Sequence, residues 1–136
     1  MVTMTLDLPT WLRTQLDADE QTARAAMWAG YECWTAYEFN YVRDTWHVDD
    51  SYYEGVASIQ AQAADSEAVA RHIVRQQPLN VLADIAAKRR ILAVHVDQRE
   101  CERCTWLDDE FYACETLRLL ALPYADRPGY DEGWKP

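Results

Sequence analysis

Long apolar runs are missing from this sequence, and glycine is scarce. Apolar residues make up 49% of the 136-residue chain, yet no stretch of eighteen is apolar throughout, so no transmembrane helix is expected. The chain does not begin with a basic segment followed by an apolar one, so no secretory signal is expected either. With four glycines in all, it has neither a glycine-rich phosphate-binding loop nor a nucleophile-elbow motif. We therefore expect a cytoplasmic, globular protein.

Basic residues are also few. Thirteen Lys and Arg stand against 23 Asp and Glu, which gives a net charge of −10. Residues 31–63 contain six acids and one arginine, whereas residues 77–105 contain five bases and four acids. Clustered positive charge is the main source of affinity for nucleic acid. Direct nucleic-acid binding is therefore not expected, and the opposing feature is the run Lys88-Arg89-Arg90. The acidic segment favours a partner protein with a basic face.

Hydrophobic periodicity divides the chain into helices and one small sheet. Apolar residues recur at helical spacing over 8–29 and in two helices within 65–96. Alternation over 31–41 predicts a half-buried strand, and we expect a small aromatic-faced antiparallel sheet over 31–60. The last helix and an aromatic tail, which we expect to fold back onto the body, occupy 114–136. The prediction is a single α+β domain over residues 1–136, with about four helices and two or three strands.

The aromatic face of the predicted strand has two interpretations. Its odd positions include Tyr31, Tyr37, Phe39 and Tyr41. Stacking platforms for bases and sugars use such faces, but the acids of this segment weaken a nucleotide version. Packing of the aromatic face against the helices is the favoured interpretation.

Three of the four cysteines lie between residues 101 and 114. Cys101 and Cys104 have the Cys-x-x-Cys spacing of a zinc knuckle. The next residues resemble a short hairpin, and Cys114 then begins a helical run, where the helix dipole favours a thiolate. His95 stands just upstream as the fourth ligand. The sequence thus predicts a zinc-stapled turn, a turn held by one structural zinc ion, over residues 95–114 before the last helix.

The fourth ligand and the metal itself have alternatives. If His95 is not a ligand, the reserves are His72, Cys33 and Glu115. The cysteines can instead be free thiols in a reducing cytosol. A disulfide or a redox Cys-x-x-Cys is less favoured, because redox motifs of this kind usually follow a strand of a βαβ unit and this one follows a helix.

Three segments resemble a small domain-of-unknown-function family of actinobacteria and their phages. They are WLRTQLDADEQTARAA at 11–26, DSEAVARHIVRQQPLNVLADIAAKRRIL at 65–92 and CETLRLLALPYADRPGYDEGW at 114–134. The chain departs from the family pattern after the first helix, where Trp28-Ala-Gly-Tyr replaces Pro-Gly-Pro-Trp, and at Ala113, where members tend to have proline. The resemblance implies the same fold and a mobile-element setting. It brings no catalytic residues.

These observations favour a non-enzymatic intracellular protein with an interaction or regulatory role and one structural zinc. One alternative is an acidic decoy that occupies the nucleic-acid site of a host enzyme. The other is a metal-dependent hydrolase, which needs an open coordination position and a general base. The candidate bases are Glu100, Glu102, Asp108 and Glu110.

Overall fold

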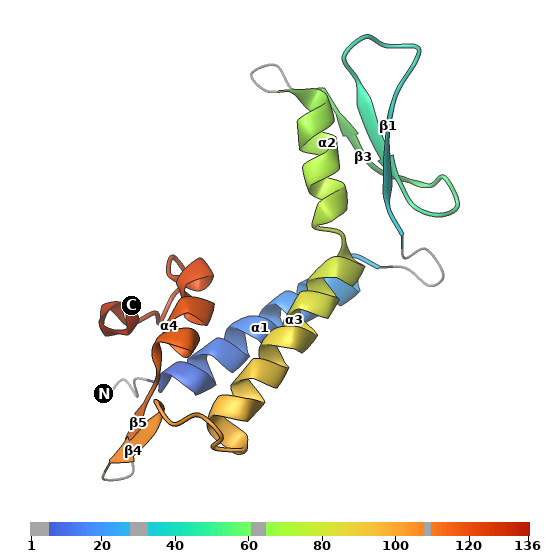
Figure 1. The fold of residues 1–136 in the computed structure, drawn as a ribbon. Coiled ribbons are helices and arrows are strands. Elements are labelled where there is room, and N and C mark those ends of the chain that lie inside the picture. The colour runs from blue at the N-terminus through green and yellow to red at the C-terminus, as the bar shows by residue number, and fades with distance from the viewer. Residues whose placement is uncertain (1–5, 28–32, 61–64, 108–109) are drawn as a thin grey trace, which may run out of the picture. The chain divides into compact units, whose positions relative to one another are not determined.

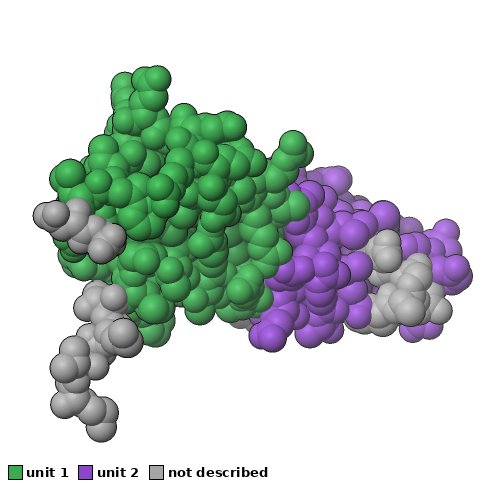
Figure 2. Space-filling view, turned by 90° about the horizontal axis from the view of Figure 1, so that it is seen from below, with its two compact units in different colours: residues 1–19, 84–136 green, residues 20–83 purple. Residues whose placement is uncertain are grey.

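The computed structural model describes residues 6–27, 33–60, 65–107 and 110–136. The chain divides into two compact units (Figure 2). One comprises residues 1–19 and 84–136, and the other comprises residues 20–83. The expected single domain over 1–136 stays a prediction.

The described residues form four α-helices and two small antiparallel sheets (Figure 1), which confirms the predicted α+β class. The helices are α1 (Leu8–Ala25), α2 (Ser66–Arg75), α3 (Pro78–Leu92) and α4 (Glu115–Ala121), and a π-helical turn (Ala93–Asp97) follows α3. Two 3-10 turns, Leu122–Tyr124 and Glu132–Trp134, lie in the tail. The strands are β1 (Thr35–Glu38), β2 (Trp46–Asp49), β3 (Gly55–Ile59), β4 (Thr105–Leu107) and β5 (Glu110–Tyr112).

Helix α1 is shorter than the predicted helix over 8–29. Its regular part ends at Ala25. The amide of Met27 then bonds the carbonyl of Arg24 at 3.2 Å, a three-residue bond that tightens the chain out of α-helical geometry. Residues 28 and 29 of the predicted helix lie outside the described residues. The predicted apolar face is confirmed, since Leu8, Leu12 and Leu16 are buried.

In the unit of residues 20–83, a three-stranded sheet packs on helix α2. The strand order is β1-β2-β3, and Ala36, Val48 and Ala57 lie opposite one another across it. These side chains face α2, where Val48 forms a buried cluster with Ile59 and Ala70. Asp65 caps α2 by accepting the amides of Glu67 and Ala68, as the predicted helix start requires.

The aromatic face of β1 does not pack against helix α2, contrary to the favoured interpretation. The even-numbered Trp34 and Ala36 pack on the buried cluster, whereas the odd-numbered Tyr37 is 40% exposed and Tyr41 is 90% exposed. Alternation along a strand fixes two faces but not which one is buried. Here β2 decides, because Val48 and Trp46 pair with the even-numbered positions of β1. The residue Tyr31 lies outside the described residues.

The strands are also shorter than predicted. The alternating segment 31–41 yields a strand over Thr35–Glu38 among its described residues, and the last strand of the sheet predicted over 31–60 begins at Gly55. The buried carboxylate of Asp50 causes the later start, because it accepts the amides of Tyr52 and Glu54 at 2.8 and 2.9 Å and fixes a turn. Residues 31 and 32 lie outside the described part of the chain.

In the other unit, the aromatic tail folds back as predicted. The indole N–H of Trp11 donates to the carbonyl of Pro128 at 3.0 Å. The rings of Tyr130 and Trp134 lie 5.5 and 5.4 Å from that of Trp11. Gly129 has φ 84°, and a Cβ there would meet Trp11 Nε1 at 3.0 Å. The tail is therefore packed as part of this unit.

Among the helices within the described residues, none combines the length and the apolar character needed to cross a bilayer.

Candidate metal centre

His95 is positioned by a change of helix type. Helix α3 ends at Leu92, and the chain continues as a π-helical turn in which the amide of Gln98 bonds the carbonyl of Ala93 at 2.8 Å. Arg99 then adopts φ 52° and turns the chain away, as a residue that follows a helix often does. The amide of Glu100 closes this turn on the carbonyl of Val94 at 3.0 Å. The reversal brings the Cys-x-x-Cys segment back beside His95.

The hairpin β4–β5 brings Cys104 and Cys114 together. It pairs Thr105 with Tyr112 and Leu107 with Glu110, so Cys104 and Ala113 lie side by side just outside the two strands, and the next residue, Cys114, donates its amide to Sγ of Cys104. Cys114 is also the N-cap of α4, with φ −69° and ψ 170°, and its side chain forms no capping bond. Its thiol is therefore available for a metal. The hairpin and the helix start were both predicted from the sequence.

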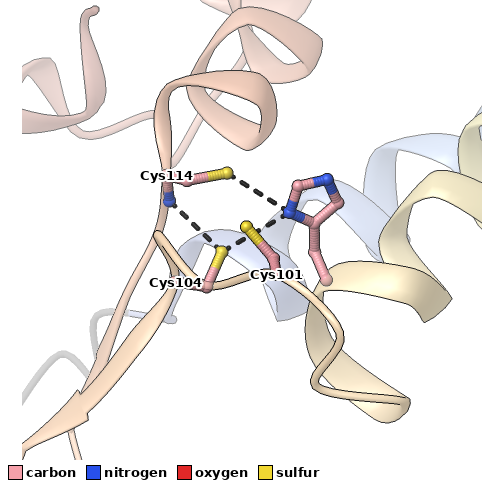
Figure 3. Close-up of side chains that lie close together, drawn as sticks. Cys101, Cys104 and Cys114 are labelled. Atoms are coloured by element: carbon pink, nitrogen blue, oxygen red, sulfur yellow. Dashed lines mark hydrogen bonds between the residues drawn. The ribbon is translucent and has the colours of Figure 1, made fainter.

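The four predicted ligands form one cluster. Nδ1 of His95 lies 3.5 Å from Sγ of Cys104 and 3.2 Å from Sγ of Cys114. The amide of Cys114 lies 3.4 Å from Sγ of Cys104. The sulfur of Cys101 completes the group, and all four ligand atoms lie within 4.8 Å of one another. The three labelled cysteines in Figure 3 point toward one another, and all the cysteines are free thiols.

The cluster has the dimensions of a tetrahedral zinc site. Zn–S and Zn–N bonds of about 2.3 and 2.0–2.1 Å place neighbouring tetrahedral ligands about 3.5–3.8 Å apart. The measured separations of 3.2 and 3.5 Å are close to these values, so one ion fits with small side-chain adjustments. Three thiolates and one imidazole form a soft donor set, which suits zinc better than calcium or magnesium.

The local charges favour a cation at this place. Burial opposes ionisation of Cys101, but hydrogen bonds from the backbone amides of Arg103 and Cys104 and from the two neighbouring thiols together outweigh it and lower the pKa of Cys101. Burial raises the pKa of Cys104 to about 12, and the neighbouring thiols add to this rise against the amide of Cys114. Three thiols this close cannot all ionise unless a cation compensates their charge. A divalent metal supplies that compensation.

The reserve ligands are not in the cluster. Within the described residues it contains His95 and the three cysteines, and it includes none of His72, Cys33 and Glu115. The candidate general bases Glu100, Glu102 and Glu110 are also absent from it. All three are exposed, and Glu110 accepts a hydrogen bond from the hydroxyl of Tyr112 at 2.9 Å. The fourth candidate, Asp108, lies outside the described residues.

A cavity of about 650 Å³ lies on the hairpin but is not lined by any ligand of the cluster. Its walls come from the start of α1, the hairpin, α4 and the tail, and include Trp106, Phe111, Arg118 and Trp134. Ala113, next to Cys114, also borders it. The cluster therefore does not open into this cavity.

The hairpin itself has little apolar packing. Trp106 is 45% exposed and Leu107 is 60% exposed, and only Phe111 among the residues of the two strands is half-buried. An isolated two-stranded hairpin is marginally stable in water. The cysteines at its two ends are consequently the best-placed groups to hold it.

A small α+β chain with a His/Cys cluster before its last helix is the class of protein that this fold and site define. The chain belongs to the family of unknown function DUF6221, whose family model matches residues 5–136. The resemblance to a domain-of-unknown-function family is thereby confirmed. No curated protein and no solved structure matches the chain.

Proposed function

We propose that this protein is a non-enzymatic interaction or regulatory protein whose C-terminal hairpin is held by one structural zinc ion. The observation that carries the proposal is the cluster of His95 Nδ1 with the sulfurs of Cys101, Cys104 and Cys114 within 4.8 Å. In structural zinc sites four protein ligands fill the tetrahedron, whereas catalytic sites have three and keep a position for water. Four such ligands support the structural role and disfavour the hydrolase alternative.

The role of the ion follows from the elements that it connects. His95 comes from the turn after α3, Cys101 from the segment that follows it, Cys104 from the residue before β4 and Cys114 from the cap of α4. Bound zinc therefore joins the end of one helix to the start of the next across the hairpin. Because such a site does not persist in an unfolded chain, the free energy of metal binding contributes to folding.

We further propose that the partner is a protein with a basic face. Residues 33–60 contain five carboxylates and one arginine. Two of these acids, Asp49 and Asp50, are buried, so the exposed charge comes from Glu38, Asp44 and Glu54. Such a surface repels phosphate groups and attracts basic proteins, and salt screens the attraction over about 8–10 Å.

The basic run of α3 is partly engaged within its own unit, which supports the same proposal. Lys88 pairs with Asp84 at 2.6 Å and donates to the hydroxyl of Tyr124 at 3.1 Å. Arg89 pairs with Asp17 at 2.6 Å. A phosphate backbone would have to compete with these carboxylates for the same side chains.

A gel-shift titration with duplex and single-stranded DNA near physiological salt tests the choice of partner. We expect no shift at micromolar protein. Binding that weakens with salt and disappears when Lys88, Arg89 and Arg90 are changed to Ala would contradict the proposal. The decoy alternative has its own test, which is competition with DNA for a basic host protein. A cytoplasmic location and an origin in actinobacteria and their phages stay predictions.

A further inference from the structure

Four aromatic rings form a continuous ladder on the sheet of residues 20–83. The rings of Tyr41 and Phe39 lie 5.5 Å apart, and Phe39 stacks on His47 at 4.4 Å with the ring planes 10° apart. His47 in turn lies 5.6 Å from Tyr37. The hydroxyl of Tyr37 donates to the carboxylate of Asp49 at 2.8 Å. We call Tyr37, Phe39, Tyr41 and His47 the ring ladder.

The ring ladder lies on the sheet face opposite α2. Tyr37 pairs with His47, and His47 pairs with Ser58. These positions alternate with those of Ala36, Val48 and Ala57, which face the helix. Figure 1 shows α2 along one side of β1 and β3 in this unit. Within the described part of the unit, the core packing thus accounts for one face of the sheet and leaves the aromatic face without a role.

The charges around the ring ladder are mostly negative. The buried Asp49 bonds Tyr37 at one end of it, and the exposed Asp44 lies in the loop between β1 and β2, whereas Glu38 occupies an even-numbered position of β1, on the face of Ala36. Arg43 is the one base among residues 33–60. Aromatic faces attract cations through the ring quadrupole. The planar guanidinium group of arginine also stacks on rings and pairs with carboxylates, which the ammonium of lysine does less well.

We propose that the ring ladder binds an arginine-bearing segment of a partner protein, with guanidinium groups stacked on the rings and paired with the exposed carboxylate of Asp44. This inference rests on the proposed basic partner and names the surface and the side chain that meet. Complementary charge supports a basic segment as the occupant, and the acids disfavour a phosphate-bearing chain, whose bases would otherwise suit the same rings.

The test is an NMR titration of the ¹⁵N-labelled, zinc-loaded full chain with three peptides near physiological salt. The probes are acetyl-(Gly-Arg)₄-amide and its lysine and glutamate counterparts. We expect the arginine peptide to shift the amides of residues 35–49 and to bind about two- to fivefold more tightly than the lysine peptide. The glutamate peptide should cause no shift. Equal affinity for all three peptides overturns the inference.

Matched variants locate the binding surface. Tyr41→Ala should weaken binding of the arginine peptide about two- to fivefold, and the double variant Phe39→Ala/Tyr41→Ala should weaken it further. Tyr53→Ala is the control, because Tyr53 is an equally exposed tyrosine, 86% against 90%, and is not one of the four rings. Its affinity should equal that of the unaltered protein.

Three results separate the failure of this inference from that of the proposed function. Arginine-peptide binding that is unchanged in Tyr41→Ala overturns the ring ladder as the site, while a basic partner still stands. No binding of either cationic peptide overturns the ring ladder and counts against a basic partner as well. A dimer in sedimentation that Tyr41→Ala dissociates assigns the surface to a second copy and overturns the proposed occupant.

Discussion

The two β elements of this chain are held in different ways. The sheet of β1, β2 and β3 has a helix on one face, and Val48, Ile59 and Ala70 are buried between them. The hairpin β4–β5 has no comparable apolar face, and five of its six described strand residues are exposed. What it has instead is a cysteine just before its first strand and another shortly after its second, both in the His/Cys cluster.

The two β elements differ in how much apolar surface each one buries, and this difference indicates which of them needs a metal. Burial of apolar surface contributes about 25 cal/mol per Å², and an element with little surface to bury cannot offset its own conformational entropy. In the proposed function, a zinc ion held by His95 and the three cysteines supplies the missing free energy. The three-stranded sheet has such a core, and the recognition role that we propose for it lies on its other, aromatic face.

The largest expected effect comes from removing a ligand. Cys104→Ser should abolish stoichiometric zinc binding, because three remaining ligands and a hydroxyl form a much weaker site. Structural zinc binds with about 10–16 kcal/mol in isolated peptides, so a loss of several kcal/mol is expected. Hydrogen exchange should show lost protection over 105–121, with 35–59 nearly unchanged.

The control for this experiment is Cys33→Ser. Cys33 is exposed and is not part of the cluster, so metal content and stability should be retained. If Cys104→Ser retained the stability of the zinc-loaded protein, the ion would be dispensable and the difference between the two β elements would vanish.

The converse change lies in the apolar core of the sheet. Ile59→Ala should lower the free energy of unfolding by about 2–4 kcal/mol, the usual cost of a cavity, because Ile59 is buried against Val48 and Ala70. Zinc content should be unchanged. Chemical denaturation followed by circular dichroism, with metal analysis of the same sample, measures both. Loss of zinc in this variant would show that the two elements do not act separately.

A smaller effect is expected at the start of α2. Asp65 accepts the amides of Glu67 and Ala68 at 2.9 and 3.2 Å. Asp65→Ala should cost about 1 kcal/mol, and Asp65→Asn should restore most of it because an amide oxygen also caps a helix. Thermal unfolding of both variants decides the matter. If both variants lost the same stability, the contribution of Asp65 would come from its negative charge and not from its hydrogen bonds as a cap.

The smallest effect concerns pH. The hydrogen bond from Tyr37 to Asp49 raises the pKa of Tyr37, with burial and the carboxylate charge adding to the rise. Because the pKa of Tyr37 is higher in the folded than in the unfolded state, this hydrogen bond contributes its full stabilisation of the fold below the ordinary tyrosine pKa near 10. The contribution is lost as pH rises through the pKa of the folded state. Tyr37→Phe should therefore cost below about 0.5 kcal/mol at pH 7–9 and less above pH 10. A cost that grows above pH 10 would contradict this account.

Much of the metal centre could be predicted from the sequence, because its information is local. The Cys-x-x-Cys spacing, the hairpin residues and the helical run after Cys114 each indicate a short-range structure, and together they indicate the cluster. His95 was the non-local member. Its approach depends on the π-helical turn and on the positive φ of Arg99, for which the sequence carries no recognisable signal.

The sheet was harder to predict, for a physical reason. Aromatic side chains occupy both faces of β1 and its flanks, since Trp34 faces the core and Tyr37 faces outward. The choice between the faces depends on pairing with β2, which is not encoded within β1. The burial of Asp50, which accepts two amides within the turn that it forms, likewise has no signal in the local sequence.

Metal stoichiometry tests the central claim most directly. Native mass spectrometry and elemental analysis of gently purified protein should give one zinc per chain. Each single change of His95, Cys101, Cys104 or Cys114 to a residue that does not bind metal should reduce that value, whereas Cys33→Ser should preserve it. Protein that contains no metal, or two zinc ions per chain, would contradict the account.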